Sequence, residues 1–475
     1  MDNDEYYDDE EFREMLNDYE EAVKSGGPVF MDADDLADIA DYYQMHERFE
    51  EAEKAMRRAI ELEPHSMVAL SYQMREALVL KDFQAAEDYL AQMPDKDQPD
   101  YIYSRAEIWI AQGLADKADA YLRLCLEEDV ADDEYQDYVM DVANLWAEYS
   151  NSEKAMEWMM RACPEDTEDF KELLGRTYFG MGDYTTSASV FNELIDKDPY
   201  QRRYWNALAN AQYMNEDYQA AIDSSEYAIA IDQNDLDAIL TKANALFRLE
   251  EYEEALKFYE RYAEQERDEY VLLYQGCCLV YLKRHQEAIE RLEEAEKAAP
   301  PHSPYLAEIY QEMAFVYNEL GMPEAAFAYI DKTDALDCDH ADMMVIRAHI
   351  MLSRRREEEA EELFKQAIRL SGYSPKVVMR VAVSVYDNHY LEMAYRLFRK
   401  YFNMSDFSME NLCTDGYAYM ALCCHDLKRF DEYLLYLKIA CTRNPMEAKQ
   451  VLGHLFPKEF LPKEYHAFAQ KALKQ

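Results

Sequence analysis

Small residues recur along this chain at a period close to 34 residues, and this repeat constrains the fold more than any other sequence feature. Eleven of twelve such positions hold Ala or Gly; the set is Ala40, Met74, Ala106, Ala143, Gly175, Ala209, Ala243, Gly276, Ala314, Ala348, Ala382 and Ala421. Successive members are 34, 32, 37, 32, 34, 34, 33, 38, 34, 34 and 39 residues apart. Such a period is typical of an array in which each unit buries its apolar face only against its neighbours.

A second small residue follows each of these positions after twelve residues. Ten of these twelve are Ala; the set is Ala52, Ala86, Ala118, Ala155, Ser187, Ala221, Ala255, Ala288, Ala326, Ala360, Ala394 and Tyr433. Small residues let two helices approach closely where they cross. Aromatic residues such as Tyr43, Phe191 and Tyr259 supply the bulk that fills the space to the neighbouring unit. The pattern therefore predicts a series of closely packed helix pairs.

This arrangement, with prolines near the ends of several units, resembles the tetratricopeptide repeat (TPR), a helix–turn–helix unit of about 34 residues. The resemblance covers residues 33–447. It implies an all-α, right-handed superhelical α-solenoid of about twelve repeats with a concave and a convex face. Residues 377–385 alternate like a β-strand. Their register nevertheless places Val378, Val381 and Val385 on the first helix of a repeat, and we predict a helix there.

Composition and charge agree with an all-helical chain and exclude several classes of protein. Only 11 Gly and 14 Pro are present in 475 residues, too few for a turn-rich β-sandwich or for glycine-rich nucleotide loops. The formal net charge is −49, which argues against a nucleic-acid-binding protein. The charge is uneven: residues 375–475 hold 14 basic and 11 acidic side chains, a net of +3, so residues 1–374 carry −52.

The domain organisation follows from the repeat register and its interruptions. We expect residues 1–30 to be an acidic, partly disordered extension with an amphipathic helix over residues 10–24. Residues 33–447 form the repeat array, and residues 448–475 form capping helices that cover its last apolar face. Extra residues at 127–135, 299–306 and 403–412 predict soft joints within the array.

Motifs for catalysis, cofactor binding and metal binding are not found. The sequence lacks GxGxxG, GxxxxGK[ST], HExxH and GxSxG. We interpret Met31–Asp35 as a helix N-cap, Asp337–His340 as a turn with capping side chains, and Arg354–Arg356 as a solvated turn. We therefore predict no catalytic, cofactor-binding or metal-binding residues, no cofactor and no enzymatic activity.

Nine cysteines without a CxxC motif indicate buried thiols in a reducing compartment. The first residues lack the basic and apolar regions of a secretory signal. The longest uncharged apolar stretch, residues 270–282, is too short to cross a bilayer, which takes about 20 residues. We expect a cytoplasmic protein.

The resemblance also implies a binding groove, which in TPR proteins is lined mainly by one face of the first helices. The implied groove residues are Arg203, Asn206, Asn210, Tyr213, Leu240, Asn244 and Phe247. Equivalent positions elsewhere are Asn144, Tyr270, Leu273, Gln311, Phe315, Asn318 and His349. Amide side chains can hydrogen-bond a peptide backbone without demanding a particular sequence. Arg176 and Arg203 resemble a fragment of the carboxylate clamp of chaperone-binding members, but the lysines of that clamp are absent.

The sequence thus favours a protein–protein interaction scaffold or adaptor that binds a peptide or protein in an acidic superhelical groove. The negative potential predicts a basic partner, and neither nucleic acid nor membrane. The alternative is a cytoplasmic regulatory receptor that changes curvature when it binds a peptide or small ligand. The identity of the partner, the groove face that it uses and the oligomeric state are not predicted.

Overall fold

The regular elements of the chain are helices wherever the structure describes it. This computed structural model describes residues 10–25, 29, 31–45, 48–96, 98–128, 130–131, 134–162, 167–405, 415–457 and 459–473. Contacts between Cα atoms divide the chain into two units, Met1–Gln233 and Asn234–Gln475, and each unit is described by itself. Residues 1–9 of the acidic extension and most of the expected joint at 403–412 lie outside the described residues.

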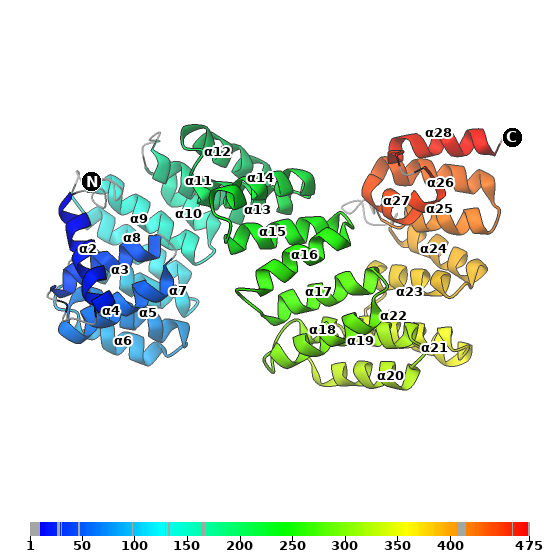
Figure 1. Cartoon of the computed structure of the whole chain (residues 1–475), viewed down its shortest axis with the longest axis horizontal. Helices are drawn as coiled ribbons and strands as arrows, with labels where there is room; N and C mark the ends of the chain where they lie inside the picture. Colours follow the sequence, from blue (N-terminus) through cyan, green and yellow to red (C-terminus); the bar gives the residue numbers. More distant parts are fainter. Residues whose placement is uncertain are drawn as a thin grey trace. The chain divides into compact units, whose positions relative to one another are not determined.

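The described residues of unit 1 form one single helix followed by six helix pairs (Figure 1). The single helix is α2 (Glu10–Ser25). The pairs are α3 (Ala33–Met45) and α4 (Phe49–Leu62), α5 (Met67–Val79) and α6 (Phe83–Gln92), α7 (Pro99–Ala111) and α8 (Ala115–Glu128), α9 (Tyr135–Glu148) and α10 (Ser152–Met159), α11 (Glu168–Gly180) and α12 (Tyr184–Lys197), and α13 (Arg202–Met214) and α14 (Tyr218–Ile231). The helix predicted over residues 10–24 is confirmed by α2.

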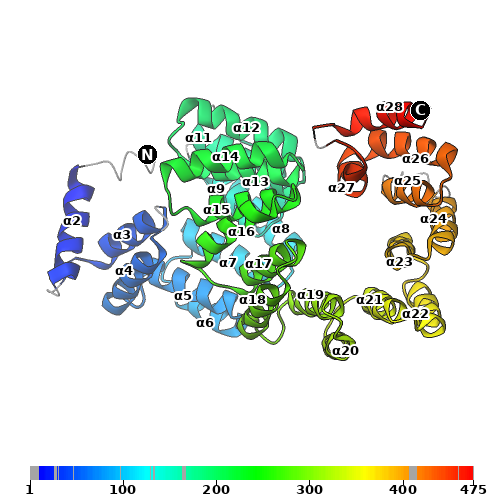
Figure 2. The same cartoon turned by 45° about the vertical axis from the view of Figure 1, so that its right-hand side comes forward.

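In the part of unit 2 that the structure describes there are six further pairs and two terminal helices, and Figure 2 shows α19 to α22 as successive pairs. The pairs are α15 (Leu236–Arg248) and α16 (Tyr252–Ala263), α17 (Glu269–Tyr281) and α18 (His285–Ala298), α19 (Leu306–Glu319) and α20 (Pro323–Lys332), α21 (His340–Ser353) and α22 (Glu357–Leu370), α23 (Pro375–Asp387) and α24 (Leu391–Ser405), and α25 (Tyr417–Asp426) and α26 (Phe430–Arg443). The terminal helices are α27 (Pro445–Leu452) and α28 (Pro462–Ala472), and α28 packs against α26 and α27. Short 3₁₀ turns follow α20 and α27.

The all-α solenoid predicted from the repeat is confirmed. The two helices of each pair pack against each other, and within each unit successive pairs pack together, as α12 does on α13 and α16 on α17. The run at residues 377–385 lies within α23, and Val378, Val381 and Val385 are buried there. Burial on one helical face therefore outweighs the preference of β-branched residues for strands.

In eleven of the repeats, from the second onward, a described left-handed residue lies between the two helices, seven positions after the first small residue. In the described repeats this residue has φ between 57° and 79°; the set is Lys81, Gly113, Ser150, Gly182, Glu216, Glu250, Lys283, Gly321, Arg355, His389 and Lys428. The next residue donates its N–H back to the carbonyl five residues earlier, as Asp183 does to Tyr178 at 3.0 Å. This Schellman closure ends the first helix and turns the chain into the second.

The left-handed turns predict opposite effects for two substitutions. Gly182 has φ +79° and nothing within 4 Å of an added Cβ, so Gly182→Ala introduces backbone strain alone. We expect it to lower the free energy of unfolding by about 1 kcal/mol. Lys81 has φ 57°, and Lys81→Gly should raise that free energy by up to about 1 kcal/mol. Urea unfolding followed by circular dichroism measures both, and equal signs for the two variants would contradict the explanation.

Candidate functional site

The four groove residues predicted on α13 lie in unit 1. Arg203 is held by the carboxylate of Glu172 on α11, with 3.3 Å between Nε and Oε2, and its guanidinium lies 5.1 Å from the centre of the Tyr204 ring. Asn206 is half-buried and Asn210 is exposed. Tyr213 packs edge to face with Tyr218 of the next helix, at 5.5 Å between ring centres.

The three predicted groove residues on α15 lie in unit 2, where tyrosines surround them. The side-chain oxygen of Asn244 accepts hydrogen bonds from the hydroxyls of Tyr259 at 2.7 Å and Tyr270 at 3.0 Å. Phe247 packs edge to face against Tyr252 and Tyr274, and Leu240 is half-buried. Two tyrosine hydroxyls therefore share the side-chain oxygen of Asn244.

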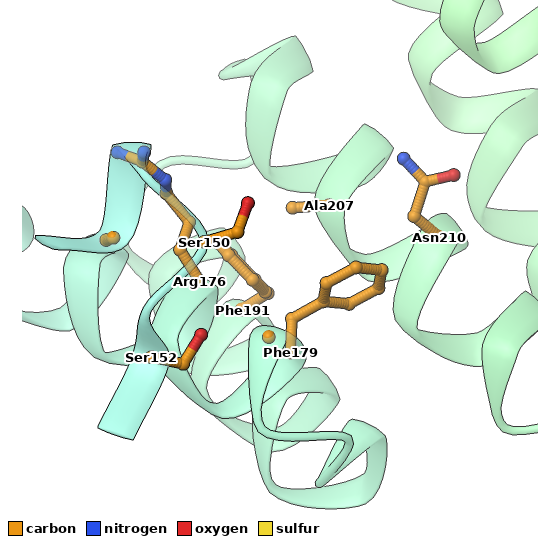
Figure 3. A pocket seen from close by; sticks show the side chains of 9 residues that line it. Ser150, Ser152, Arg176, Phe179, Phe191, Ala207 and Asn210 are labelled. Carbon is orange, nitrogen blue, oxygen red and sulfur yellow. The ribbon is translucent and has the colours of Figure 1, made fainter. Parts of the chain in front are cut away.

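A cavity of about 390 Å³ opens on the first-helix side of unit 1. It is lined by Ala147, Ser150, Ser152, Arg176, Phe179, Gly180, Phe191, Ala207 and Asn210, from the segment that runs from α9 to α13. In Figure 3 the ring of Phe179 points toward Asn210, and the guanidinium of Arg176 points to the opposite side. The volume lies in the lower part of the usual range for ligand pockets, roughly 300–1,000 Å³.

Polar side chains form a connected row beside this cavity. Arg176 donates to the side-chain oxygen of Asn144 at 3.2 Å, and the amide nitrogen of Asn144 donates to Glu148 at 3.0 Å. The groove-equivalent residue Asn144 is thus in contact with Arg176, which the sequence analysis named only for its resemblance to part of a carboxylate clamp. These hydrogen bonds hold the side chain of Arg176 beside Asn144. Phe179 and Phe191 form the aromatic part of the cavity lining.

In unit 2, the first helix α19 carries two carboxylates that form no ion pair with a described residue. Glu308 and Glu312 lie one turn apart on α19, and neither forms an ion pair with any residue that the structure describes. Loss of hydration raises the pKa of Glu312 to about 7, with a smaller contribution from the charge of Glu308. Partial loss of hydration also raises the pKa of Asp387, on α23, to about 6.

Aromatic and thiol groups of α17 lie beside this carboxylate pair. After burial, the charge of Glu312 is the largest cause that raises the pKa of Cys277 and of Tyr281. Tyr281 is 56% exposed and stacks on Tyr252 with 4.4 Å between ring centres. An exposed aromatic face beside carboxylates is suited to a guanidinium or ammonium group.

The motifs that the sequence analysis set aside have structural roles. Asp339 accepts hydrogen bonds from the backbone N–H groups of Ala341 and Asp342 and caps α21, as predicted. In the same way, the side chain of Asp32 accepts a hydrogen bond from the backbone N–H of Asp35 at 2.8 Å. Among the described residues, no group of three or more His, Cys, Asp or Glu side chains is arranged to hold a metal ion.

The arginine run at 354–356 is the turn between α21 and α22. Arg354 donates to the backbone carbonyl of Asn318, Arg355 to the hydroxyl of Tyr390, and Arg356 to Glu359. All three side chains therefore have partners within their own unit, which agrees with a turn rather than with a recognition patch.

Sequence reasoning missed the cavity and the carboxylate pair, although the repeat register carried a signal for both. Ala147 stands four residues after Ala143, where the next three repeats have Phe179, Tyr213 and Phe247. Glu308 stands six residues before Ala314, the position that holds Arg203 and Tyr270 in other repeats. Comparing the residues that different repeats have at one position would have identified both Ala147 and Glu308 as departures from their neighbours.

Within the described residues, no helix is long and apolar enough to cross a membrane. Seven cysteines are described, and none of them forms a disulfide bond with another described residue. The cytoplasmic location stays a prediction.

Two family profiles match the middle of the chain. The profile described as "Tetratricopeptide repeat" matches residues 173–238, and the profile described as "Anaphase-promoting complex, cyclosome, subunit 3" matches residues 214–295. Each match covers less than half of the 475 residues. No curated protein sequence matches the chain significantly.

Several solved structures resemble the chain at low sequence identity. Yeast Tom70 is 13% identical, with a TM-score of 0.44, over 93% of this chain and 96% of that one. The APC/C hetero-tetramer Cut9–Hcn1 is 14% identical, with a TM-score of 0.36, over 83% and 90%. YrrB, titled a TPR protein with an unusual peptide-binding site, is 19% identical, with a TM-score of 0.32, over 38% and 92%. With scores this low, none of these likenesses carries an argument about function.

Proposed function

Because this chain is a tetratricopeptide-repeat protein, we propose that it is an interaction scaffold that binds a basic peptide or protein segment on the first-helix faces of its repeats. The proposed contact surface of unit 1 includes Arg203, Asn206, Asn210 and Tyr213. That of unit 2 includes Leu240, Asn244 and Phe247. The observation that carries the proposal is the pair Glu308 and Glu312, two carboxylates on a first helix that lack cationic partners among the described residues.

Ionising these carboxylates in the folded protein costs free energy. The pKa of Glu312 is raised to about 7 by loss of hydration and by Glu308, so ionising this side chain in the folded protein is unfavourable. An arriving Lys or Arg side chain supplies the missing counter-charge. The exposed ring of Tyr281 adds a cation–π surface beside it.

The net charge of the chain supports the same partner. A formal charge of −49 accelerates the approach of a cationic protein and repels anionic ones, and salt screens this effect over a Debye length of about 8 Å at physiological ionic strength. The same negative charge therefore accounts for both the acidic groove and the basic partner that we propose.

The proposal predicts a selective loss of binding when the carboxylate pair is neutralised. The probe is a fluorescein-labelled nonapeptide of alternating arginine and glycine, titrated by fluorescence anisotropy against the full chain. The double variant Glu308→Gln/Glu312→Gln should weaken binding at least ~10-fold at 50 mM salt. Raising the salt to 500 mM should weaken wild-type binding steeply.

The matched control changes two glutamates with the same spacing on a second helix. Glu358 and Glu362 are exposed on α22 and lie one turn apart. The variant Glu358→Gln/Glu362→Gln removes the same charge and should change affinity less than ~2-fold. Equal losses in the two double variants, or an affinity that salt does not change, would contradict the proposal.

A further inference from the structure

Three consecutive repeats carry an aromatic pair at the turn between their helices. In unit 1, Phe179 meets Tyr184 edge to face at 5.4 Å between ring centres, and Tyr213 meets Tyr218 at 5.5 Å. The third pair lies in unit 2, where the distance between Phe247 and Tyr252 is 5.4 Å. In each repeat the first ring stands four residues after the small residue of the first helix, and the second ring stands nine residues after it.

The preceding repeat lacks both rings. Counting four and nine residues from Ala143 gives Ala147 and Ser152. Both residues line the 390 Å³ cavity, whose other wall is formed by Phe179 of the next repeat. The cavity is therefore bounded by two small residues at the positions where the next three repeats carry an aromatic pair.

The backbone around the cavity cannot close to fill it. A Cβ on Gly180 would lie 2.0 Å from the hydroxyl oxygen of Ser152, so the end of α11 already lies against the start of α10. Phe191, which lines the cavity, is itself buried, and so are Val142 and Trp146 on α9. Cores relax only partly around missing side chains, so the space persists.

The lining selects the chemistry of an occupant. Arg176 is the one charged residue among the nine that line the cavity, and no carboxylate is among them. The site therefore disfavours a Lys or Arg side chain. The ring of Phe179 offers the edge-to-face packing that the chain uses in its own pairs, and aromatic pairs are worth more than their buried area. Ser150 and Asn210 supply polar groups beside the backbone of a bound segment.

We propose that this cavity takes a phenylalanine or tyrosine side chain from the partner protein, which occupies the place of the ring missing at Ala147. The inference rests on the proposed function, since it names a further contact of the same partner protein. It assigns the aromatic anchor to unit 1 and leaves the cationic contact on α19 in unit 2.

The test uses the full chain labelled with ¹³C at alanine methyl groups. N-acetyl-phenylalaninamide is the probe, and N-acetyl-alaninamide and N-acetyl-argininamide are comparison ligands. We expect ring-current shifts at the methyl groups of Ala147 and Ala207 with the phenylalanine probe alone. Unchanged methyl signals at both positions, or equal shifts with the alanine compound, would overturn the proposal.

Filling the cavity from within gives the second arm of the test. Ala147→Phe should weaken binding of the phenylalanine probe at least ~10-fold, read from the methyl group of Ala207. Ala230 is exposed on α14, and Ala230→Phe is the matched control that should leave the affinity unchanged. If Ala147→Phe loses its helical circular dichroism, Ala207→Leu fills the same cavity from α13 and is read at Ala147. Undiminished affinity in a folded filling variant would refute the site.

The outcomes separate this inference from the proposed function. If the arginine–glycine nonapeptide binds through Glu308 and Glu312 while the phenylalanine probe does not bind, the aromatic anchor is wrong and the scaffold proposal stands. If the probe binds at Ala147 while the nonapeptide does not bind, the basic partner is wrong and the aromatic site stands.

Discussion

Replacing Trp158 with alanine is expected to lower the free energy of unfolding of unit 1 by about 3–5 kcal/mol, the usual cost of deleting a buried aromatic side chain. Trp158 is fully buried within the core that α7 to α11 share. Its indole N–H donates to Asp119 at 2.8 Å, and the same carboxylate accepts from Arg123 and Lys154. The substitution therefore leaves a cavity and removes one of the three donors that offset the burial of Asp119.

Two further variants divide this loss into its parts. Trp158→Phe keeps most of the ring but leaves an oxygen of Asp119 without its donor, so its cost should be smaller, about 1–3 kcal/mol. Trp205 is half-buried, and its N–H donates to the carbonyl of Pro199 at 2.9 Å. Trp205→Ala is the matched control and should cost less than Trp158→Ala.

Urea unfolding followed by circular dichroism measures these differences, and hydrogen exchange locates them. Exchange should accelerate in α8 to α10, because in a repeat array each repeat is stabilised by its nearest neighbours. A loss for Trp158→Ala no larger than that for Trp205→Ala would show that the Asp119 cluster does not support the core.

Replacing Glu312 with glutamine is expected to stabilise the chain by about 2 kcal/mol at pH 8 and to have little effect at pH 5. The pKa of this carboxyl rises from 4.5 to about 7 in the folded protein, chiefly through loss of hydration. A raised folded-state pKa means that stability is fully present below pH 4.5 and is lost as the pH rises through 7. Each pKa unit corresponds to ~1.4 kcal/mol, and partial exposure to water reduces the total.

Urea unfolding at pH 5, 6, 7 and 8 tests this dependence. The difference between Glu312→Gln and the wild type should grow with pH and level off above pH 7. Glu358→Gln on α22 removes the same charge from an exposed position and should give a nearly constant difference. A Glu312→Gln effect that is equal at pH 5 and pH 8 would contradict the burial of this carboxyl.

The repeat register was enough to predict the helix pairs and many of their buried residues. Eleven of its twelve first-helix positions hold Ala or Gly. Residues as distant in sequence as Ala106 and Ala382 are both fully buried on first helices. The register also placed Val378 and Val381 on a helix against their own propensity. This works because each repeat meets only its neighbours, so short-range sequence information contains most of the contacts.

The repeat register did not predict the contacts that the groove residues make with other helices. The register placed Asn244 on a first-helix face, but it did not reveal that the hydroxyls of Tyr259 and Tyr270 occupy its oxygen. The register likewise placed Arg203 there without revealing its ion pair with Glu172. Both contacts link a groove position to another helix and depend on side-chain rotamers, which a sequence pattern does not specify.

The sequence by itself thus determined the period, the helix pairs and the acidic character of this protein, because those properties follow from local spacing and composition. Only the tertiary structure decided that Ala147 and Ser152 enclose a cavity and that Glu312 loses its hydration. Both facts depend on the atoms that surround a residue in space. An alanine on a helix is buried in the core of one repeat and lines a cavity in another, depending on the side chains that surround it.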